Sequence, residues 1–228
     1  KSPQGKLLRL ERLRADRVTH PGAVRSYIED CRHLRNLDHV NLLRLLDVDR
    51  DEQGLYVVSE HVAGVSLSRM LKRLSGKGWT LSMEEALHVL HQILFGLRDL
   101  QDKVGPELFH GALTPEAVWV GTDGYVRIRH YRLHRLELES DPEAPDWERY
   151  CLPPELGKQV SADPRADMYS LGALFLACFG ASEAHVKHKA IPEQTPPNWG
   201  ALLLACLSPA PAQRPRHAAD MLNRLGGY

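Results

Sequence analysis

Apolar residues follow two different spacings along the chain, and the change between them separates a strand-rich front part from a helical remainder. In residues 6–14, KLLRLERLR, apolar and charged residues alternate from Leu8 onward. This is the period of a half-exposed strand, although Leu, Arg and Glu also favour helix. Residues 23–37 place apolar side chains at helical spacing instead. Two further strands are predicted in residues 41–50 and 54–62, on either side of the polar turn DEQG.

The remainder of the chain is predicted to be mainly helical. Ser82 and Glu85 form an S-x-x-E capping box, and the apolar stripe after them predicts a long helix through about Gln101. Residues 168–179, MYSLGALFLACF, are apolar on nearly every face, which is typical of a helix at the centre of a domain. The other predicted elements are a short helix from Leu67, a hairpin over residues 118–128, an exposed acidic loop over residues 133–150, and helices over residues 199–207 and 216–225.

Composition and charge exclude several classes of protein. With 228 residues, 43% of them hydrophobic, the chain is long enough to bury a core. Lys and Arg together number 29, as do Asp and Glu, so there is no net positive charge to hold nucleic acid. No apolar run approaches the roughly 20 residues of a membrane span. The 4 cysteines lie far apart without a C-x-x-C pair, which favours reduced thiols, and we expect a cytoplasmic protein.

Seven motifs occur in the order and at the spacing of the protein kinase family. They are HLRNLDHVNLLRLLDV, LYVVSEHV, HGALTPEAVWV, VRIRHYRL, CLPPE, ADMYSLGALF and CLSPAPAQRP. The chain therefore resembles a protein kinase domain from its third strand to its last helix. The resemblance implies an α+β, bilobal fold with a truncated, mainly-β N-lobe in residues 1–62 and a helical C-lobe in residues 63–228.

The same resemblance shows which residues stand where a kinase carries its catalytic groups. Phosphoryl transfer needs a lysine on the phosphates, oxygen ligands for magnesium and an aspartate that orients the attacking hydroxyl. None of these residue types stands at the matching position, so we expect no catalytic residue, no metal ligand set, no cofactor and no enzyme activity. The substituted positions are Glu11 for the strand-three lysine, Asp30 for its C-helix partner, Ala112 for the catalytic aspartate, Thr114 for the catalytic-loop lysine, and Ala117 and His130 for the two magnesium ligands.

The position of the strand-three lysine has two alternatives. Strand alternation favours Glu11, and its carboxylate would then repel both phosphate and the carboxylate of Asp30. A shift of one residue would place Arg12 there instead and restore an ion pair with Asp30.

Further positions follow from the resemblance. Trp119 falls under the place of the adenine ring, where it could fill part of the nucleotide pocket or be an ordinary half-buried strand aromatic. Ser59 falls at the gatekeeper position, and Glu60 and Val62 complete a vestigial pocket. Residues that hold the fold persist: His110 and Tyr131 match members of the regulatory spine, Asp167 matches the F-helix aspartate, and Glu155 and Arg214 match a buried ion pair.

Within the family, two short similarities point to different relatives. HGALT resembles the HGNLT of the nuclear-receptor-binding pseudokinases, whereas HVAGVSL resembles the hinge of the pseudokinase segment in the starvation-responsive translation-initiation-factor kinase. We expect a pseudokinase that controls a protein partner as an interaction or allosteric module, with a kinase domain in cis or in trans, or a second copy, as partner. The alternative is an atypical kinase or another phosphoryl or nucleotidyl transferase, in which Asp123 or Asp141 supplies a displaced metal ligand.

Overall fold

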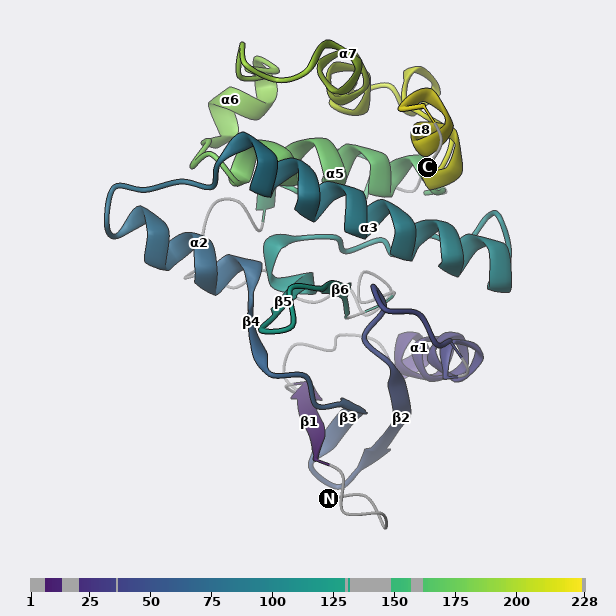
Figure 1. Cartoon of the computed structure of the whole chain (residues 1–228). Helices are drawn as coiled ribbons and strands as arrows, with labels where there is room; N and C mark the ends of the chain where they lie inside the picture. The colour runs from purple at the N-terminus through teal and green to yellow at the C-terminus, as the bar shows by residue number, and fades with distance from the viewer. Residues whose placement is uncertain are drawn as a thin grey trace.

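A computed structural model describes residues 7–13, 21–35, 37–129, 131, 149–156 and 162–226. A three-stranded antiparallel sheet and one helix form the end of the molecule that holds the N-terminus (Figure 1), and we call this part the small lobe. The strand order of the sheet is β1-β3-β2. The elements of the small lobe are β1 (Leu8–Leu13), α1 (Pro21–Leu34), β2 (Leu45–Asp51) and β3 (Gly54–Glu60).

The rest of the described chain forms a larger, mainly helical lobe. Its small sheet, in the order β4-β5-β6, lies between the small lobe and the long helix α3 (Figure 1). The elements are β4 (Gly64–Ser66), α2 (Leu67–Ser75), α3 (Met83–Val104), η2 (Pro115–Ala117), β5 (Val118–Gly121), β6 (Val126–Ile128), α5 (Arg165–Ala177), α6 (Glu183–Lys187), α7 (Pro197–Cys206), η4 (Pro211–Gln213) and α8 (Ala218–Arg224). The predicted α+β fold with a small sheet lobe and a helical lobe is confirmed.

Local signals account for the two helices at the centre of the helical lobe. The capping box at the start of α3 is present, because Glu85 N–H donates to Ser82 Oγ at 3.2 Å and Ser82 N–H donates to Glu85 Oε2 at 2.8 Å. The helix α5 is buried along nearly its whole length, as its continuous apolar sequence predicts. It packs against α3 and α7, and Figure 1 shows α3 and α5 crossing the middle of this lobe.

A buried polar network connects the small lobe to the helical lobe. Asn41 donates to Gln92 Oε1 of α3 at 2.7 Å and to the Val126 carbonyl of β6 at 2.8 Å. Gln92 Oε1 also accepts the Val126 N–H at 2.8 Å. The prediction of a strand beginning at residue 41 is therefore wrong, because residues 41–43 bond to the helical lobe and β2 begins only at Leu45.

Several other predicted boundaries differ from the structure. The helix predicted over residues 23–37 ends at Leu34, and the following Arg35 turns toward β2, where its Nε donates to the Leu46 carbonyl at 2.9 Å. The loop predicted over residues 133–150 lies outside the described residues except for its last two, which are helical. Among the described helices, none has both the length and the apolar composition needed to span a bilayer.

Candidate functional site

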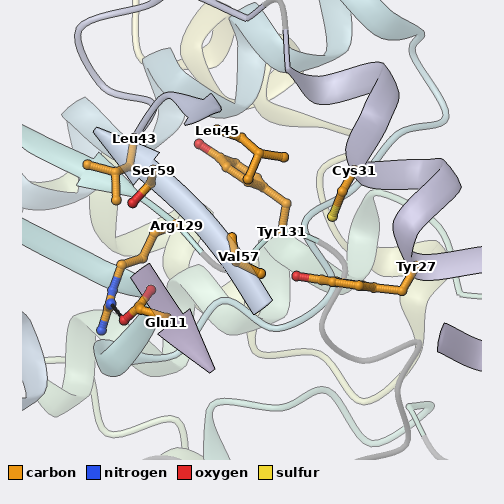
Figure 2. Close-up of a pocket in the computed structure, with 9 residues that line it drawn as sticks. All are labelled: Glu11, Tyr27, Cys31, Leu43, Leu45, Val57, Ser59, Arg129 and Tyr131. Atoms are coloured by element: carbon orange, nitrogen blue, oxygen red, sulfur yellow. Dashed lines mark hydrogen bonds and ion pairs between the residues drawn. The ribbon is translucent and has the colours of Figure 1, made fainter. Parts of the chain in front are cut away.

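A small cavity lies between the described parts of the two lobes (Figure 2). Its water-accessible volume is about 20 Å³, which is room for roughly one water molecule. Pockets for small-molecule ligands usually measure roughly 300–1,000 Å³. Protein side chains therefore fill this part of the cleft in the structure. The residues that line the cavity are Glu11, Tyr27, Cys31, Leu43, Leu45, Val57, Ser59, Arg129 and Tyr131.

A buried arginine lies at the centre of the cleft. Arg129, directly after β6, exposes 3% of its side chain and binds two carboxylates from distant parts of the chain. Its Nη1 donates to Glu11 Oε1 of β1 at 2.6 Å, and Figure 2 shows these two side chains meeting. Its Nη2 donates to the carboxylate of Glu116 in η2, and its Nε donates to the carbonyl of the same residue at 3.2 Å. The guanidinium thus has hydrogen-bond acceptors on three nitrogens, which a buried charge requires.

The structure places Glu11, and not Arg12, in the cleft. Successive residues of a strand point to opposite faces, so only one of the two can reach the helical lobe. Arg12 lies on the other face of the sheet, where its guanidinium donates two hydrogen bonds to Asp51, at 2.7 and 2.8 Å. Glu11 also accepts a hydrogen bond from Arg9 at 2.8 Å, so its carboxylate lies between two arginines.

Asp30 and Glu11 line different cavities. The residues of α1 that line the cavity are Tyr27 and Cys31, whereas Asp30 lines a separate depression beside the end of α3. The predicted repulsion between the two carboxylates stays a prediction. Arg129 approaches Glu11. Strand alternation after Ile128 predicts an exposed side chain at this position, so no local signal indicates that Arg129 is buried.

Trp119 connects the cleft to the linker between the lobes. Its indole Nε1 donates to the Val62 carbonyl oxygen at 3.2 Å. The guanidinium carbons of Arg9 and Arg129 lie 4.3 and 5.0 Å from the centroid of its ring, within the range of cation–π attraction. A Cβ atom on Gly64 would lie 2.8 Å from Trp119 Nε1 and 2.2 Å from the Val120 carbonyl oxygen, so only glycine fits there.

The other two residues of the predicted pocket lie at the end of β3. Ser59 is buried and lines the cavity. Glu60 is half-buried, and its Oε1 accepts the Arg44 N–H at 3.0 Å. Ser59 thus borders the cavity, whereas the assignment of Glu60 to a nucleotide pocket stays a prediction.

A buried aspartate of α5 holds the loop that begins at His110. Asp167 Oδ2 accepts the His110 N–H at 2.6 Å, and Oδ1 accepts the Gly111 N–H at 2.8 Å. Gly111 has φ of 79°, a left-handed conformation that favours glycine. The Nδ1 of His110 accepts the Ala112 N–H at 3.3 Å, so its Nε2 carries the proton and donates to the Arg129 carbonyl at 2.7 Å.

The remaining positions of this loop are occupied by small or capping residues. Thr114 precedes η2, and its carbonyl accepts the Ala117 N–H at 2.9 Å. Ala117 is buried, and its carbonyl accepts the Arg129 N–H at 2.9 Å, which keeps Arg129 attached to this loop. His130 lies outside the described residues.

The residues that the resemblance assigns to the framework lie in two clusters. His110 and Tyr131 are buried with their ring centroids 5.4 Å apart, and burial raises the pKa of Tyr131 well above its ordinary value. The Tyr131 hydroxyl donates to the Ile128 carbonyl at 2.7 Å. In the helical lobe, Arg214 donates two hydrogen bonds to Glu155, at 2.5 and 3.0 Å. Their roles in the family stay a prediction.

A metal site would need several acidic, histidine or cysteine side chains close together. Within the ranges that the structure describes, no three of them gather as they would around a metal ion. Asp123, which the displaced-ligand alternative requires near the cleft, lies in the turn between β5 and β6 and pairs with Arg127 at 2.7 Å. Asp141 lies outside the described residues.

The ion pair between Asp123 and Arg127 should make the stability of the protein depend on pH. Hydrogen bonds from the Arg127 guanidinium and the Tyr125 amide lower the pKa of Asp123 from 3.8 to about 2. Because this pKa is lower in the folded protein, the pair adds stability above about pH 4 that is lost as the pH falls toward 2. Asp123→Asn should therefore cost less than about 1 kcal/mol at pH 6, as exposed pairs do, and less still at pH 3.

Urea unfolding at pH 6 and pH 3 measures this difference, and carboxyl-carbon NMR measures the titration directly. The control is Arg127→Gln, which should raise the Asp123 pKa toward its ordinary value. An Asp123 midpoint near 4 in the unmodified protein would contradict the ion pair.

Comparison with known proteins connects this geometry to a family. The family model described as "Protein kinase domain" matches residues 9–223. Nuclear receptor-binding protein 2 of Mus musculus is 27% identical over 201 residues, covering 78% of this chain and 40% of that protein. Cyclin-dependent kinase F-3 of Oryza sativa subsp. japonica is 30% identical over 158 residues, and a probable serine/threonine-protein kinase nek2 of Dictyostelium discoideum is 24% identical over 144. These two alignments cover 68% and 62% of this chain and 34% of each relative, so the chain spans about a third of their length.

Solved structures show the same fold. The crystal structure of the Mycobacterium tuberculosis PknI kinase domain matches with a TM-score of 0.71, covering 95% of this chain and 82% of that one. The two sequences are 16% identical, so this similarity shows the fold alone. The predicted bilobal kinase-like fold is confirmed.

These comparisons overturn the prediction that the chain is not an enzyme. The matching family is that of protein kinase domains, and two of the relatives are named as probable serine/threonine-protein kinases. The prediction treated Glu11, Ala112, Ala117 and His130 as four separate proofs of inactivity. Catalytic side chains have to lie close together in space, and they need not come from fixed positions of a sequence motif. These substitutions therefore do not decide whether the domain is active. The similarity to the nuclear-receptor-binding group is supported, whereas that to the translation-initiation-factor kinase stays a prediction.

Proposed function

Because the chain belongs to the protein kinase domain family, we propose that it regulates a protein partner through the relative position of its two lobes. This role does not depend on whether the domain also transfers phosphate. The observation that supports it is the filled cleft, in which Glu11 and Arg129 line a cavity of about 20 Å³ and Trp119 packs against Arg129. Contacts of this kind hold one arrangement of the lobes without a ligand.

The partner that we propose is another protein, namely a kinase domain in the same or another chain, or a second copy of this one. One relative carries a name that refers to binding a nuclear receptor, which supports a protein-binding role within the family. All four cysteines are buried and lie far apart in the sequence without a C-x-x-C pair, which supports a reducing, cytoplasmic setting. We place the boundary between the lobes at residues 62 and 63, where the linker passes Trp119.

The decisive experiment measures how nucleotide competes with the side chains that fill the cleft. Thermal unfolding is followed with and without ATP and magnesium for the unmodified protein and for Trp119→Ala. The matched control is Trp79→Ala, because Trp79 is 60% exposed and lies away from the cleft, between α2 and α3. If Trp119 holds the cleft closed, ATP should raise the melting temperature of Trp119→Ala by several degrees more than that of the other two proteins. Equal shifts in all three would refute the filled cleft as a regulatory state.

A second candidate function is phosphoryl transfer by the domain itself, which the names of the relatives favour. Incubation with radiolabelled ATP and magnesium or manganese tests it directly. Incorporation that is abolished in Asp123→Asn would assign the displaced aspartate a role in metal binding. Incorporation that persists in that variant would exclude Asp123.

A further inference from the structure

Four charged side chains in the cleft join the two lobes. Arg9 and Glu11 come from β1 of the small lobe, whereas Glu116 and Arg129 come from η2 and the residue after β6. The Glu11–Arg129 pair, with 2.6 Å between Oε1 and Nη1, crosses from one lobe to the other. Glu116 and Arg129 stay within the helical lobe, so the carboxylate of Glu11 is the part that can separate from them.

The exposure of these groups is asymmetric. The Arg129 side chain is 3% exposed, whereas the side chains of Glu11 and Glu116 are 25% and 48% exposed. The arginine is anchored by its backbone N–H on the Ala117 carbonyl and by its Nε on the Glu116 carbonyl. Arg129 is therefore a fixed, buried cation with its carboxylate partners on the solvent side, an arrangement suited to receive a carboxylate.

We propose that Arg129, with Arg9 and the ring of Trp119, forms a carboxylate-binding site that Glu11 occupies, so that the occupied site latches the lobes together. An acidic side chain of the partner protein can take the place of Glu11 and release the latch. The physical reason is that exchange of one carboxylate for another keeps Nη1 of the buried guanidinium paired, whereas opening without a replacement leaves Arg129 with the carboxylate of Glu116 alone. This proposal rests on the regulatory function above and names the chemistry of its ligand.

The linker between the lobes is tied to the same site. Trp119 donates to the Val62 carbonyl at 3.2 Å, and Thr122 N–H donates to the Ala63 carbonyl at 2.9 Å. Two consecutive linker carbonyls are thus bonded to β5 and the turn after it. Since the Trp119 ring also lies against Arg9 and Arg129, displacement of Glu11 changes the surroundings of the residue that holds the linker.

Rescue by a small carboxylate tests the site. Glu11→Ala should lower the melting temperature by roughly 4–8 °C, and about 0.3 M sodium acetate should recover about half of this loss, relative to sodium chloride at equal ionic strength. The matched control is Asp51→Ala, which removes the carboxylate from the exposed Arg12 pair within the same sheet. This control should lose less than about 2 °C and show no preference for acetate. If acetate raises the melting temperature of Glu11→Ala no more than chloride does, the proposal is overturned.

The nearly isosteric variant Glu11→Gln covers the case in which Glu11→Ala fails to fold. Spin labels at the exposed positions 26 in α1 and 183 in α6, introduced as Ser26→Cys and Glu183→Cys, report the distance between the lobes, because the native cysteines are buried. The distance distribution of Glu11→Gln should be broader than that of the unmodified protein, and Asp51→Asn should leave it unchanged. An unchanged distribution in Glu11→Gln would overturn the latch. A failed acetate rescue with the expected ATP response of Trp119→Ala removes the carboxylate site and retains the regulatory function.

Discussion

Replacing Asp167 with alanine should lower the free energy of unfolding by about 3–5 kcal/mol. Asp167 is fully buried at the start of α5, and its two carboxylate oxygens accept the N–H groups of His110 and Gly111. Each hydrogen bond to a charged group contributes about 1.5–3 kcal/mol, and the alanine leaves both N–H donors buried without this acceptor. The same change should loosen the loop from His110 to Ala117. This loop bonds to the backbone of Arg129 and so holds its side chain in the cleft.

Guanidinium unfolding of matched variants measures this effect. The control is Asp163→Ala, because Asp163 also accepts a backbone N–H beside α5, that of Arg165 at 2.9 Å, but its side chain is 39% exposed. The control should cost about 1 kcal/mol or less. Asp167→Asn retains one acceptor oxygen and should fall between the two. Similar losses for Asp167→Ala and Asp163→Ala would mean that the buried hydrogen bonds do not hold the loop.

Replacing Arg214 with alanine should have a comparable effect, about 3–5 kcal/mol, because it leaves a buried carboxylate uncompensated. The Arg214 side chain is fully buried and the Glu155 side chain is 10% exposed. Arg214 also donates to the Ser208 carbonyl at 2.8 Å, and its guanidinium carbon lies 4.9 Å from the Tyr169 ring centroid. One side chain thus joins the segment at Glu155, the start of α5 and the turn before η4.

A double-mutant cycle separates the ion pair from these other contacts. Arg214→Met combined with Glu155→Gln should cost less than the sum of the single changes, because no unpaired buried charge remains. The control pair is Arg224 and Asp220 of α8, which is exposed and should contribute at most about 1 kcal/mol. If the costs of Arg214→Met and Glu155→Gln simply add, the two charges are not coupled.

The candidate site was predictable only in part. The resemblance placed Glu11, Ser59 and Trp119 around one cleft; in the structure Glu11 and Ser59 line the cavity, and Trp119 packs against Arg129. The resemblance also led to the wrong conclusion about enzyme activity, because a sequence motif shows which residue stands at one position and not which side chains meet in space. The arginine that fills the cleft, Arg129, was not predicted, because its carboxylate partner on β1 lies 118 residues away in the sequence.

By itself, the sequence determined the elements whose signals are local. The capping box at Ser82 starts α3, the continuous apolar run makes α5 a central helix, and alternation makes residues 8–13 a strand. The tertiary structure alone decided which charges meet. The burial of Arg129, its pairing with Glu11 and the bond from Trp119 to Val62 all depend on how the lobes pack. The physical reason is that hydrophobic periodicity acts over a few residues, whereas the pairing of a buried charge depends on neighbours that only the complete fold brings together.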